Sequence, residues 1–172
     1  MTRSTKPARA EVGSHWSNVI IADEIDIREI VGCTCLRLRR VTRHLTQIYD
    51  RALEPVGITI NQFGLLAHLH GSSLEGQDWL SIGALAGLVG MHPTTLNRDL
   101  KPLRAQGLVA DATDPADRRV RAVLLTGKGR GKLRKAVPCW RRAQTQVQEA
   151  MGVEATLALN GLLDLASGKL AK

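Results

Sequence analysis

The sequence has 172 residues, 44% of them hydrophobic and 23% charged, which is typical of a globular protein with one domain and its own core. No apolar run approaches the roughly 18 residues that a membrane-spanning helix needs, and residues 1–14 lack the apolar segment of a signal peptide, so we expect a cytoplasmic protein. One Phe, one Tyr and three Trp are too few aromatic rings for a protein that stacks the bases of single-stranded RNA or DNA.

The net charge of +8 is concentrated in one part of the chain. Residues 92–135 contain eleven Lys and Arg against four Asp, a net charge of +7, whereas the remainder has thirteen basic and twelve acidic residues. A basic segment of this kind is typical of a protein that binds the phosphate backbone of nucleic acid. The alternative, a solvated helix face without a partner, does not explain why the charge coincides with the elements predicted below.

A flexible tail is expected over residues 1–22, followed by a long helix from Ile25 to Leu53 that Gly32 could interrupt. Apolar and small residues recur along this helix at steps of four and three, at positions 31, 35, 38, 42, 45, 49 and 52. This spacing predicts a seam that packs against another helix. Pro55 and Gly57 then end the helix.

A second helix is predicted to begin near Thr59 and to continue through Phe63 and Leu69. Residues 71–78 are predicted to form a loop. Trp79 and Leu80 after it are expected to supply a short third strand of a sheet.

Residues 81–107 have the pattern of two short helices joined by a tight turn. Ser81 is a suitable N-cap for the first helix, and Gly90 ends that helix. Pro93 suits the first position of the second helix, because a proline there costs no backbone hydrogen bond. One face of this second helix carries Leu96, Leu100 and Leu103, and the opposite face carries Thr94, Asn97, Arg98 and Lys101. Gly107 is expected to supply the left-handed residue at its C-terminus.

Val109–Thr113 and Val120–Leu125 are predicted to be the strands of a hairpin, joined by turn-forming residues 114–117. Arginines lie at its tip and along one side, at Arg118, Arg119 and Arg121. A helix, a turn, a second helix and a basic hairpin together predict a winged helix-turn-helix. In that fold one helix enters the major groove of duplex DNA, and the hairpin lies along the backbone or minor groove.

After the hairpin, Thr126 is predicted to cap a long helix with a second seam, formed by Leu133, Val137, Trp140, Gln144, Val147 and Met151. A break at Gly152 and Val153 precedes a leucine-rich helix from Glu154 to Ala171. One small lobe cannot cover all these apolar stripes, so we expect pairing with a second copy of the chain. The predicted fold class is mainly α with a small β-wing, a winged helix-turn-helix lobe with long N- and C-terminal dimerisation helices.

Several motifs occur in the order found in the MarR family of winged-helix transcription regulators, which the sequence therefore resembles. They are Leu103-Arg-Ala-Gln-Gly107-Leu108-Val109, then Asp117-x-Arg119, then Leu125-Thr126. The link from Leu53 to Phe63 also resembles that of the family, and the resemblance covers roughly residues 30–170. It implies one domain over residues 23–172 that forms a homodimer, with residues 23–54 and 127–172 as dimerisation helices and residues 58–126 as the DNA-binding lobe.

The predicted partner is double-stranded DNA with an inverted-repeat operator. The residues expected to contact it are Thr94, Thr95, Asn97, Arg98, Lys101, Arg118, Arg119 and Arg121. The resemblance further implies that Asp117 orients Arg119 and that a small-molecule effector is a further partner. Because the sequence has no apolar run long enough to cross a membrane, no membrane partner is expected.

Motifs of enzymes and metal sites are missing from the sequence. Residues 127–132, Gly-Lys-Gly-Arg-Gly-Lys, lack the third glycine of a dinucleotide fingerprint and the Gly-Lys-Ser/Thr ending of a P-loop. His68 and His70 would point to different faces of a helix, and no His-Glu-x-x-His or double Cys-x-x-Cys occurs. We therefore expect no catalysis, no cofactor and no metal.

The three cysteines raise the question of redox control. In a cytoplasmic protein Cys33, Cys35 and Cys139 are expected to be reduced, and a cysteine on an apolar seam commonly packs as a small hydrophobe. The peroxide-sensing branch of the MarR family carries a reactive cysteine at the position that Cys35 matches. On that interpretation, Cys139 of the other subunit is the candidate resolving thiol.

The same branch has tyrosines around its thiol, whereas Ile60 and Arg39 stand at two of those positions here and only Tyr49 remains. Three functions therefore stay open. The first is a dimeric DNA-binding repressor released by a small aromatic or phenolic ligand, a class implied by the resemblance alone. The second is the same regulator switched by oxidation of Cys35, and the third is a helical protein-interaction or non-specific DNA-coating module.

Overall fold

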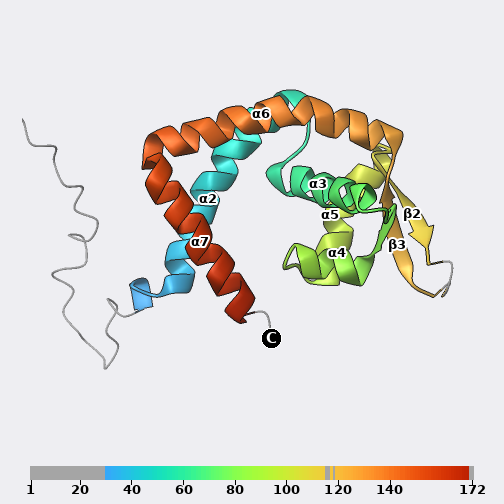
Figure 1. The fold of residues 1–172 in the computed structure, drawn as a ribbon, viewed down its shortest axis with the longest axis horizontal. Helices are drawn as coiled ribbons and strands as arrows, with labels where there is room; N and C mark the ends of the chain where they lie inside the picture. The colour runs from blue at the N-terminus through green and yellow to red at the C-terminus, as the bar shows by residue number, and fades with distance from the viewer. Residues whose placement is uncertain (1–29, 115–116, 118, 171–172) are drawn as a thin grey trace, which may run out of the picture. The chain divides into compact units, whose positions relative to one another are not determined.

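The computed structural model describes residues 30–114, 117 and 119–170, which form mainly helices and one small sheet (Figure 1). The elements in chain order are α2 (Thr34–Leu53), the 3-10 helix η2 (Glu54–Val56), α3 (Ile60–Leu74), β1 (Trp79–Ser81), α4 (Ile82–Leu88), α5 (Pro93–Ala105), β2 (Val109–Thr113), β3 (Arg121–Leu125), α6 (Gly127–Met151) and α7 (Val153–Leu170). The predicted fold class is confirmed. The expected tail, residues 1–22, lies outside the described residues. The chain divides into two units, residues 1–44 and 45–172.

In the first unit, α2 begins after a break at Gly32 and Cys33, where the sequence predicts one. Residues 34–44 of this helix are exposed. The exposed apolar side chains of this unit are Ile30, Val31, Leu36, Leu38 and Val41. The unit therefore presents a helical seam that it does not cover itself.

In the second unit, α3 begins at Ile60 because Thr59 caps it. The Thr59 hydroxyl accepts a hydrogen bond from the Gln62 amide at 3.3 Å, and the Gln62 side chain accepts one from the Thr59 amide at 3.1 Å. These two bonds satisfy amides that have no helical partner.

The prediction of a loop from residue 71 was wrong, since α3 continues to Leu74. A glycine inside a helix costs only about 1 kcal/mol relative to alanine, so Gly71 does not end it. The turn that follows α3 ends at Gly76, which has a φ of 86° that other residues rarely adopt. Residues 75–78 alone form the connection to β1.

Helices α4 and α5 form the predicted helix-turn-helix. The Ser81 hydroxyl accepts a hydrogen bond from the Ala84 amide at 3.0 Å and so caps α4. Gly90, with a φ of 63°, reverses the chain, and Pro93 opens α5 as expected. The turn is held by the Met91 amide, which donates to the Ala86 carbonyl at 2.9 Å.

The sheet has three antiparallel strands in the order β1-β3-β2. Trp79 pairs with Leu124 and Thr113 pairs with Arg121, so β3 lies between the strand that precedes the helix-turn-helix and the strand that follows it. The expected third strand at Trp79 is confirmed. This pairing ties the hairpin to the start of α4.

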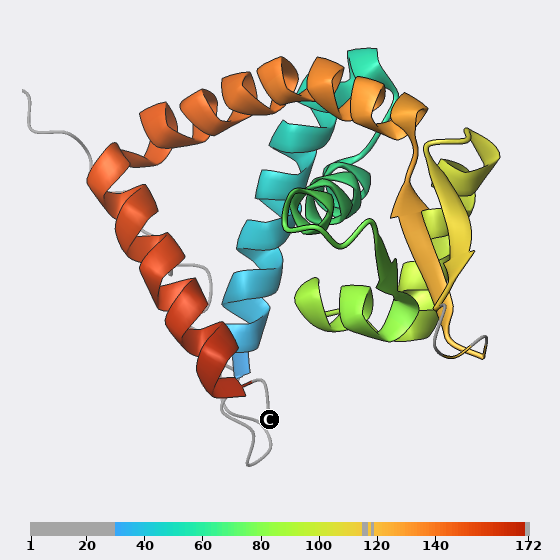
Figure 2. The ribbon, with the colours of Figure 1, turned by 45° about the vertical axis from the view of Figure 1, so that its right-hand side comes forward.

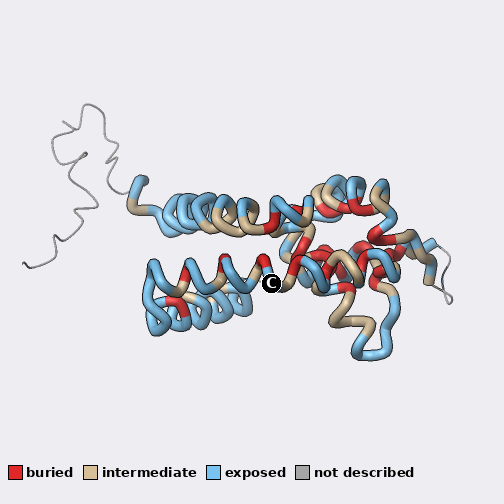
Figure 3. Tube along the Cα trace, turned by 90° about the horizontal axis from the view of Figure 1, so that it is seen from above, coloured by how far each residue is buried: buried red, intermediate tan, exposed pale blue. Residues whose placement is uncertain are grey.

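Leucines fill the core of the lobe that these elements form. Those with 0% exposure are Leu53, Leu66, Leu85, Leu96, Leu100, Leu103 and Leu108. Figure 3 shows the buried residues concentrated where the short helices and the strands meet. Replacing one such leucine by alanine typically lowers the free energy of unfolding by about 2–5 kcal/mol. Because three of these leucines belong to α5, this core fixes the position of that helix.

Helix α6 leaves the sheet at Thr126 and packs on α3 (Figure 2). Its buried face consists of Gly129, Leu133, Ala136, Cys139, Ala143 and Val147. Of the predicted seam, Leu133 and Val147 lie on this buried face, whereas Val137, Trp140 and Gln144 are half-buried and Met151 is exposed. Pairing of this seam with a second copy stays a prediction. Small side chains let the helix approach closely, and the Trp140 ring stacks on Phe63 beside them, with ring centroids 5.9 Å apart.

Gly152, with a φ of 85°, ends α6 and confirms the predicted break, and α7 begins at Val153, one residue before the predicted start at Glu154. Thr156 is the one buried residue among those described in α7. Its exposed apolar residues are Val153, Leu157, Leu162, Leu163, Leu165 and Leu170. None of the helices in the described part of the chain combines the length and the apolar character needed to cross a membrane.

Candidate nucleic-acid interface

The second helix of the helix-turn-helix, α5, has one buried and one exposed face. Three leucines on the inner face are fully buried, and the polar residues Thr94, Asn97, Arg98 and Lys101 are exposed on the outer face. Thr95 is half-buried. The His92 ring nitrogen Nδ1 accepts a hydrogen bond from the Thr94 amide at 3.3 Å and caps the helix. The outer face therefore offers side-chain donors and positive charge from a rigid helix.

Arg98 and Asn97 differ in how freely they can reach outward. The Arg98 side chain is 79% exposed, and its Nε lies 3.9 Å from an Asp99 carboxylate oxygen, at the outer limit of an ion pair. The Asn97 amide donates to the Pro93 carbonyl at 3.1 Å, so part of its capacity is used within the helix. Arg98 is thus the less constrained of the two, and a guanidinium can bond two acceptors of a guanine at once.

The hairpin presents arginines on the same lobe. The Asp117 carboxylate accepts a hydrogen bond from the backbone amide of Arg119 at 2.9 Å, which shapes the turn at the hairpin tip. Arg119 and Arg121 are exposed, and Arg121 pairs with Thr113 across the ladder. Arg118 lies outside the described residues.

An ion pair that the sequence analysis missed connects α5 to the hairpin. Arg104 Nε, in the last turn of α5, donates to Asp111 of β2 at 2.7 Å. Residues 92–135 contain eleven basic and four acidic residues, and Arg104 and Asp111 are one of each. No spacing rule links a helix end to a strand position, so the pair could not be read from the sequence.

Thr126 joins the hairpin, the end of α5 and the start of α6. Its hydroxyl oxygen lies 2.8 Å from the Gly107 carbonyl oxygen and 3.1 Å from that of Leu108, so the one proton is donated to either. The same oxygen accepts from the Gly129 amide at 3.0 Å and caps α6, as predicted. The first turn of α6 is therefore attached to the loop that follows α5.

The cysteines lie in different environments. Cys33 and Cys35 are exposed in the first unit, whereas Cys139 is buried in the second, with Arg142 Nη2 3.2 Å from its sulfur. The Tyr49 hydroxyl donates to the Gln144 side chain at 2.6 Å, and burial raises the pKa of this tyrosine above its usual value of 10.0. Within the described ranges, no three His, Cys, Asp or Glu residues gather as a metal site would require.

Comparison with solved structures finds clear relatives, although no protein-family model and no curated protein matches the sequence. The chain is 40% identical to the transcriptional regulator MosR from M. tuberculosis, over 78% of this chain and 96% of MosR, with a TM-score of 0.62. MosR in complex with DNA gives 41% identity over 78% and 98% of the two chains, with a TM-score of 0.61. A mutant of E. coli MarR complexed with operator DNA shares the fold, at 20% identity over 83% and 99% and a TM-score of 0.70.

Proposed function

The chain belongs to the MarR family of winged-helix transcriptional regulators, and from this premise we propose that it is a homodimeric, sequence-specific duplex-DNA-binding repressor that a small ligand releases. The observation that supports this most directly is the outer face of α5, where Thr94, Asn97, Arg98 and Lys101 are exposed above a fully buried leucine face. Side chains of these types read base edges in the major groove.

The hairpin supplies the second part of the interface. Arg119 and Arg121 are exposed and carry charge that phosphates attract, while the Arg104–Asp111 pair holds the strand against α5. We assign the hairpin to backbone or minor-groove contacts, and we keep Arg118, which precedes Arg119 in the sequence, as a further candidate contact. The hydrogen bond from the Arg119 amide to the Asp117 carboxylate supports the assignment of Asp117 as the residue that orients this arginine.

Dimer formation is supported by apolar surface that the described chain leaves uncovered. Residues 30–41 expose five large apolar side chains, and α7 exposes six. Surfaces of this kind mark sites of association, and most soluble homo-oligomers are two-fold dimers. A two-fold dimer with one α5 in each subunit would read an inverted repeat.

Release by oxidation remains a second candidate, because Cys33 and Cys35 are exposed and could react with an oxidant. Cys139 is buried, which gives less support to its assignment as the resolving thiol. The ligand-released repressor is the first candidate, since Ile60 and Arg39 replace two tyrosines of the peroxide-sensing pattern.

The experiment that tests the proposal measures binding of the full chain to duplexes from its own promoter region and to scrambled duplexes of the same composition. We expect a preference of at least about 1000-fold for a site with an inverted repeat. Equal affinity for every duplex would favour the DNA-coating alternative, and no binding to any duplex would favour the protein-interaction alternative.

A further inference from the structure

The Asn97 side chain, on the exposed face of α5, is hydrogen-bonded to its own helix. Asn97 Nδ2 donates to the Pro93 carbonyl oxygen at 3.1 Å, one helical turn towards the N-terminus. A carbonyl oxygen can only accept, so the nitrogen of the Asn97 amide, and not its oxygen, faces Pro93. No other residue in the described part of the chain is hydrogen-bonded to this side chain, so the amide is held from one side only.

The bond to Pro93 leaves part of the amide free for a partner outside the protein. A primary amide has two N–H donors and one carbonyl oxygen that accepts. The N–H on the Cβ side of the group is the one that faces the helix backbone, so Pro93 takes that hydrogen. The other N–H and Oδ1 lie side by side on the outer edge of the same planar group. Asn97 therefore presents one donor and one acceptor together.

The helix that carries this edge is rigid. Leu96 and Leu100, which flank Asn97 on the inner face, have 0% exposure. Pro93 occupies the first position of α5, where its ring fixes the backbone angle φ. The bond to Pro93 also restricts the two side-chain torsions of Asn97, so less entropy is lost when a ligand binds. Arg98, which is 79% exposed, has no comparable restraint.

A donor and an acceptor on one edge complement a single base in the major groove. Adenine offers N7 as an acceptor and its N6 amino group as a donor. Guanine offers two acceptors, cytosine offers its amino group, and thymine offers one acceptor beside a methyl group. The side chains of a helix lean towards its N-terminus, which is the part of such a helix that meets the base edges. The free edge of Asn97 therefore matches adenine.

We propose that Asn97 reads one adenine in each half-site of the operator, accepting from N6 through Oδ1 and donating to N7 through the free N–H of Nδ2. The Pro93 carbonyl is the group that positions this amide. The inference rests on the proposed function, because it assigns a base to the helix that is proposed to enter the groove. It adds a requirement on the DNA: one A·T pair in each half-site cannot be replaced without loss of affinity.

The test measures the affinity of the full-length protein, by fluorescence anisotropy, for its preferred duplex and for duplexes in which each base pair of the half-sites is replaced in turn. We expect Asn97→Ala to lose the preference for A·T at one position, by roughly 5- to 150-fold, and to keep the preferences elsewhere. Asn61→Ala removes the same amide from an exposed position of α3 and should change no preference. Circular dichroism checks the fold, which alanine suits better than asparagine in a helix.

A modified base identifies the atoms in contact. In 7-deazaadenine a carbon replaces N7, while pairing with thymine is kept. At the position found above, this base should weaken binding by the wild type about 2- to 12-fold, the effect of one hydrogen bond, and should leave binding by Asn97→Ala unchanged. Equal losses in the two proteins would mean that another residue reads N7, and would refute the inference.

Asn97→Gln tests the role of Pro93. Glutamine carries the same amide and can also bond both atoms of adenine, but its extra methylene moves the amide away from the Pro93 carbonyl and adds a rotatable bond. We expect this variant to prefer adenine at the same position by a smaller factor than the wild type. An equal preference would refute the positioning by Pro93.

The same measurements separate this inference from the proposed function. A protein that prefers one duplex, but shows no base pair whose recognition depends on Asn97, would refute the inference alone. A protein that binds no duplex would refute the proposed function itself.

Discussion

Replacing Arg98 by alanine should remove sequence discrimination while leaving the fold intact. The side chain is 79% exposed, and its one ion pair among the described residues, with Asp99, is 3.9 Å long. Exposed pairs contribute at most about 1 kcal/mol, and surface substitutions away from the core change stability by about 0.5 kcal/mol or less. The thermal midpoint of Arg98→Ala should therefore stay close to that of the wild type.

The cost to binding is larger, because a guanidinium that bonds two acceptors of one base contributes about 1–3 kcal/mol of discrimination. This corresponds to roughly a 5- to 150-fold loss of preference for operator over scrambled duplex. The assay is fluorescence anisotropy with both duplexes at one salt concentration, since the electrostatic part of the affinity depends on salt. Arg141→Ala is the matched control, because Arg141 is exposed on α6 and the substitution removes the same charge.

Two results would refute the reasoning. Equal weakening of Arg98→Ala on both duplexes would mean that Arg98 touches phosphate and no base. Unchanged binding to both would mean that the outer face of α5 does not enter the groove, and the proposed interface would fail with it.

The remaining predictions concern the wing, the dimer, the thiols and one glycine. Arg119→Ala should weaken binding to every duplex and flatten the dependence of affinity on salt; an unchanged slope in a salt titration would remove the wing from the interface. Light scattering at low protein concentration should give about twice 18.7 kDa, and a monomer that binds one half-site tightly would contradict the two-fold dimer. Organic hydroperoxide should leave operator binding alike in wild type and Cys35→Ser, whereas release from the wild type alone would establish an oxidant sensor. Gly129→Ala should lower the free energy of unfolding in urea by about 1–3 kcal/mol, because its Cβ would run into the Leu108 carbonyl, and Gly131→Ala, which faces open space, should show no such loss.

The helix-turn-helix could be predicted from the sequence because its signals are local. Ser81 caps a helix through an amide three residues away, and Gly90 and Pro93 act through their own backbone angles. The leucines of α5 lie on one face because of their spacing alone, which also placed the exposed polar residues opposite. The strand at Trp79 and the break at Gly152 followed from equally short patterns.

Tertiary packing decided what local patterns leave open. The face that α6 buries within the subunit includes Ala136 and Ala143, which the spacing of large apolar residues did not single out. Trp140 stacks on Phe63 of another helix beside this face. Helix α3 runs past Gly71 because one glycine costs a helix only about 1 kcal/mol relative to alanine.

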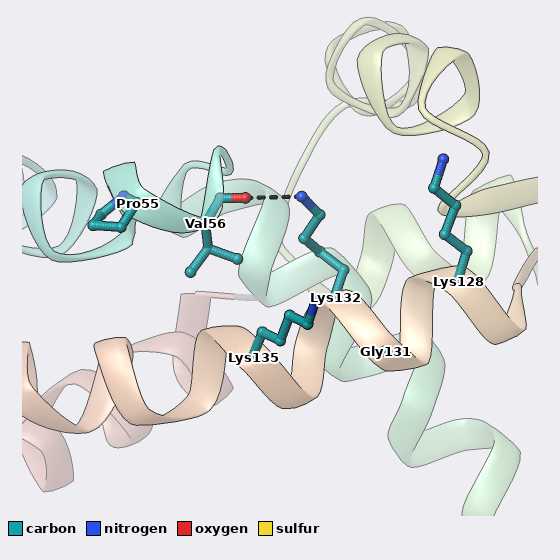
Figure 4. A pocket seen from close by; sticks show the side chains of 6 residues that line it. All are labelled: Pro55, Val56, Lys128, Gly131, Lys132 and Lys135. Atoms are coloured by element: carbon teal, nitrogen blue, oxygen red, sulfur yellow. Dashed lines mark hydrogen bonds between the residues drawn. The ribbon is translucent and has the colours of Figure 1, made fainter.

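Contacts between residues far apart in the chain could not be predicted from the sequence either. Lys132 and Val56 are 76 positions apart, and their bond exists because η2 and α6 meet in the folded chain (Figure 4). Arg104 finds Asp111 because the hairpin folds back beside the end of α5. Sequence spacing determines which side chains share a face of one helix, but only the packing of elements against one another determines which faces meet.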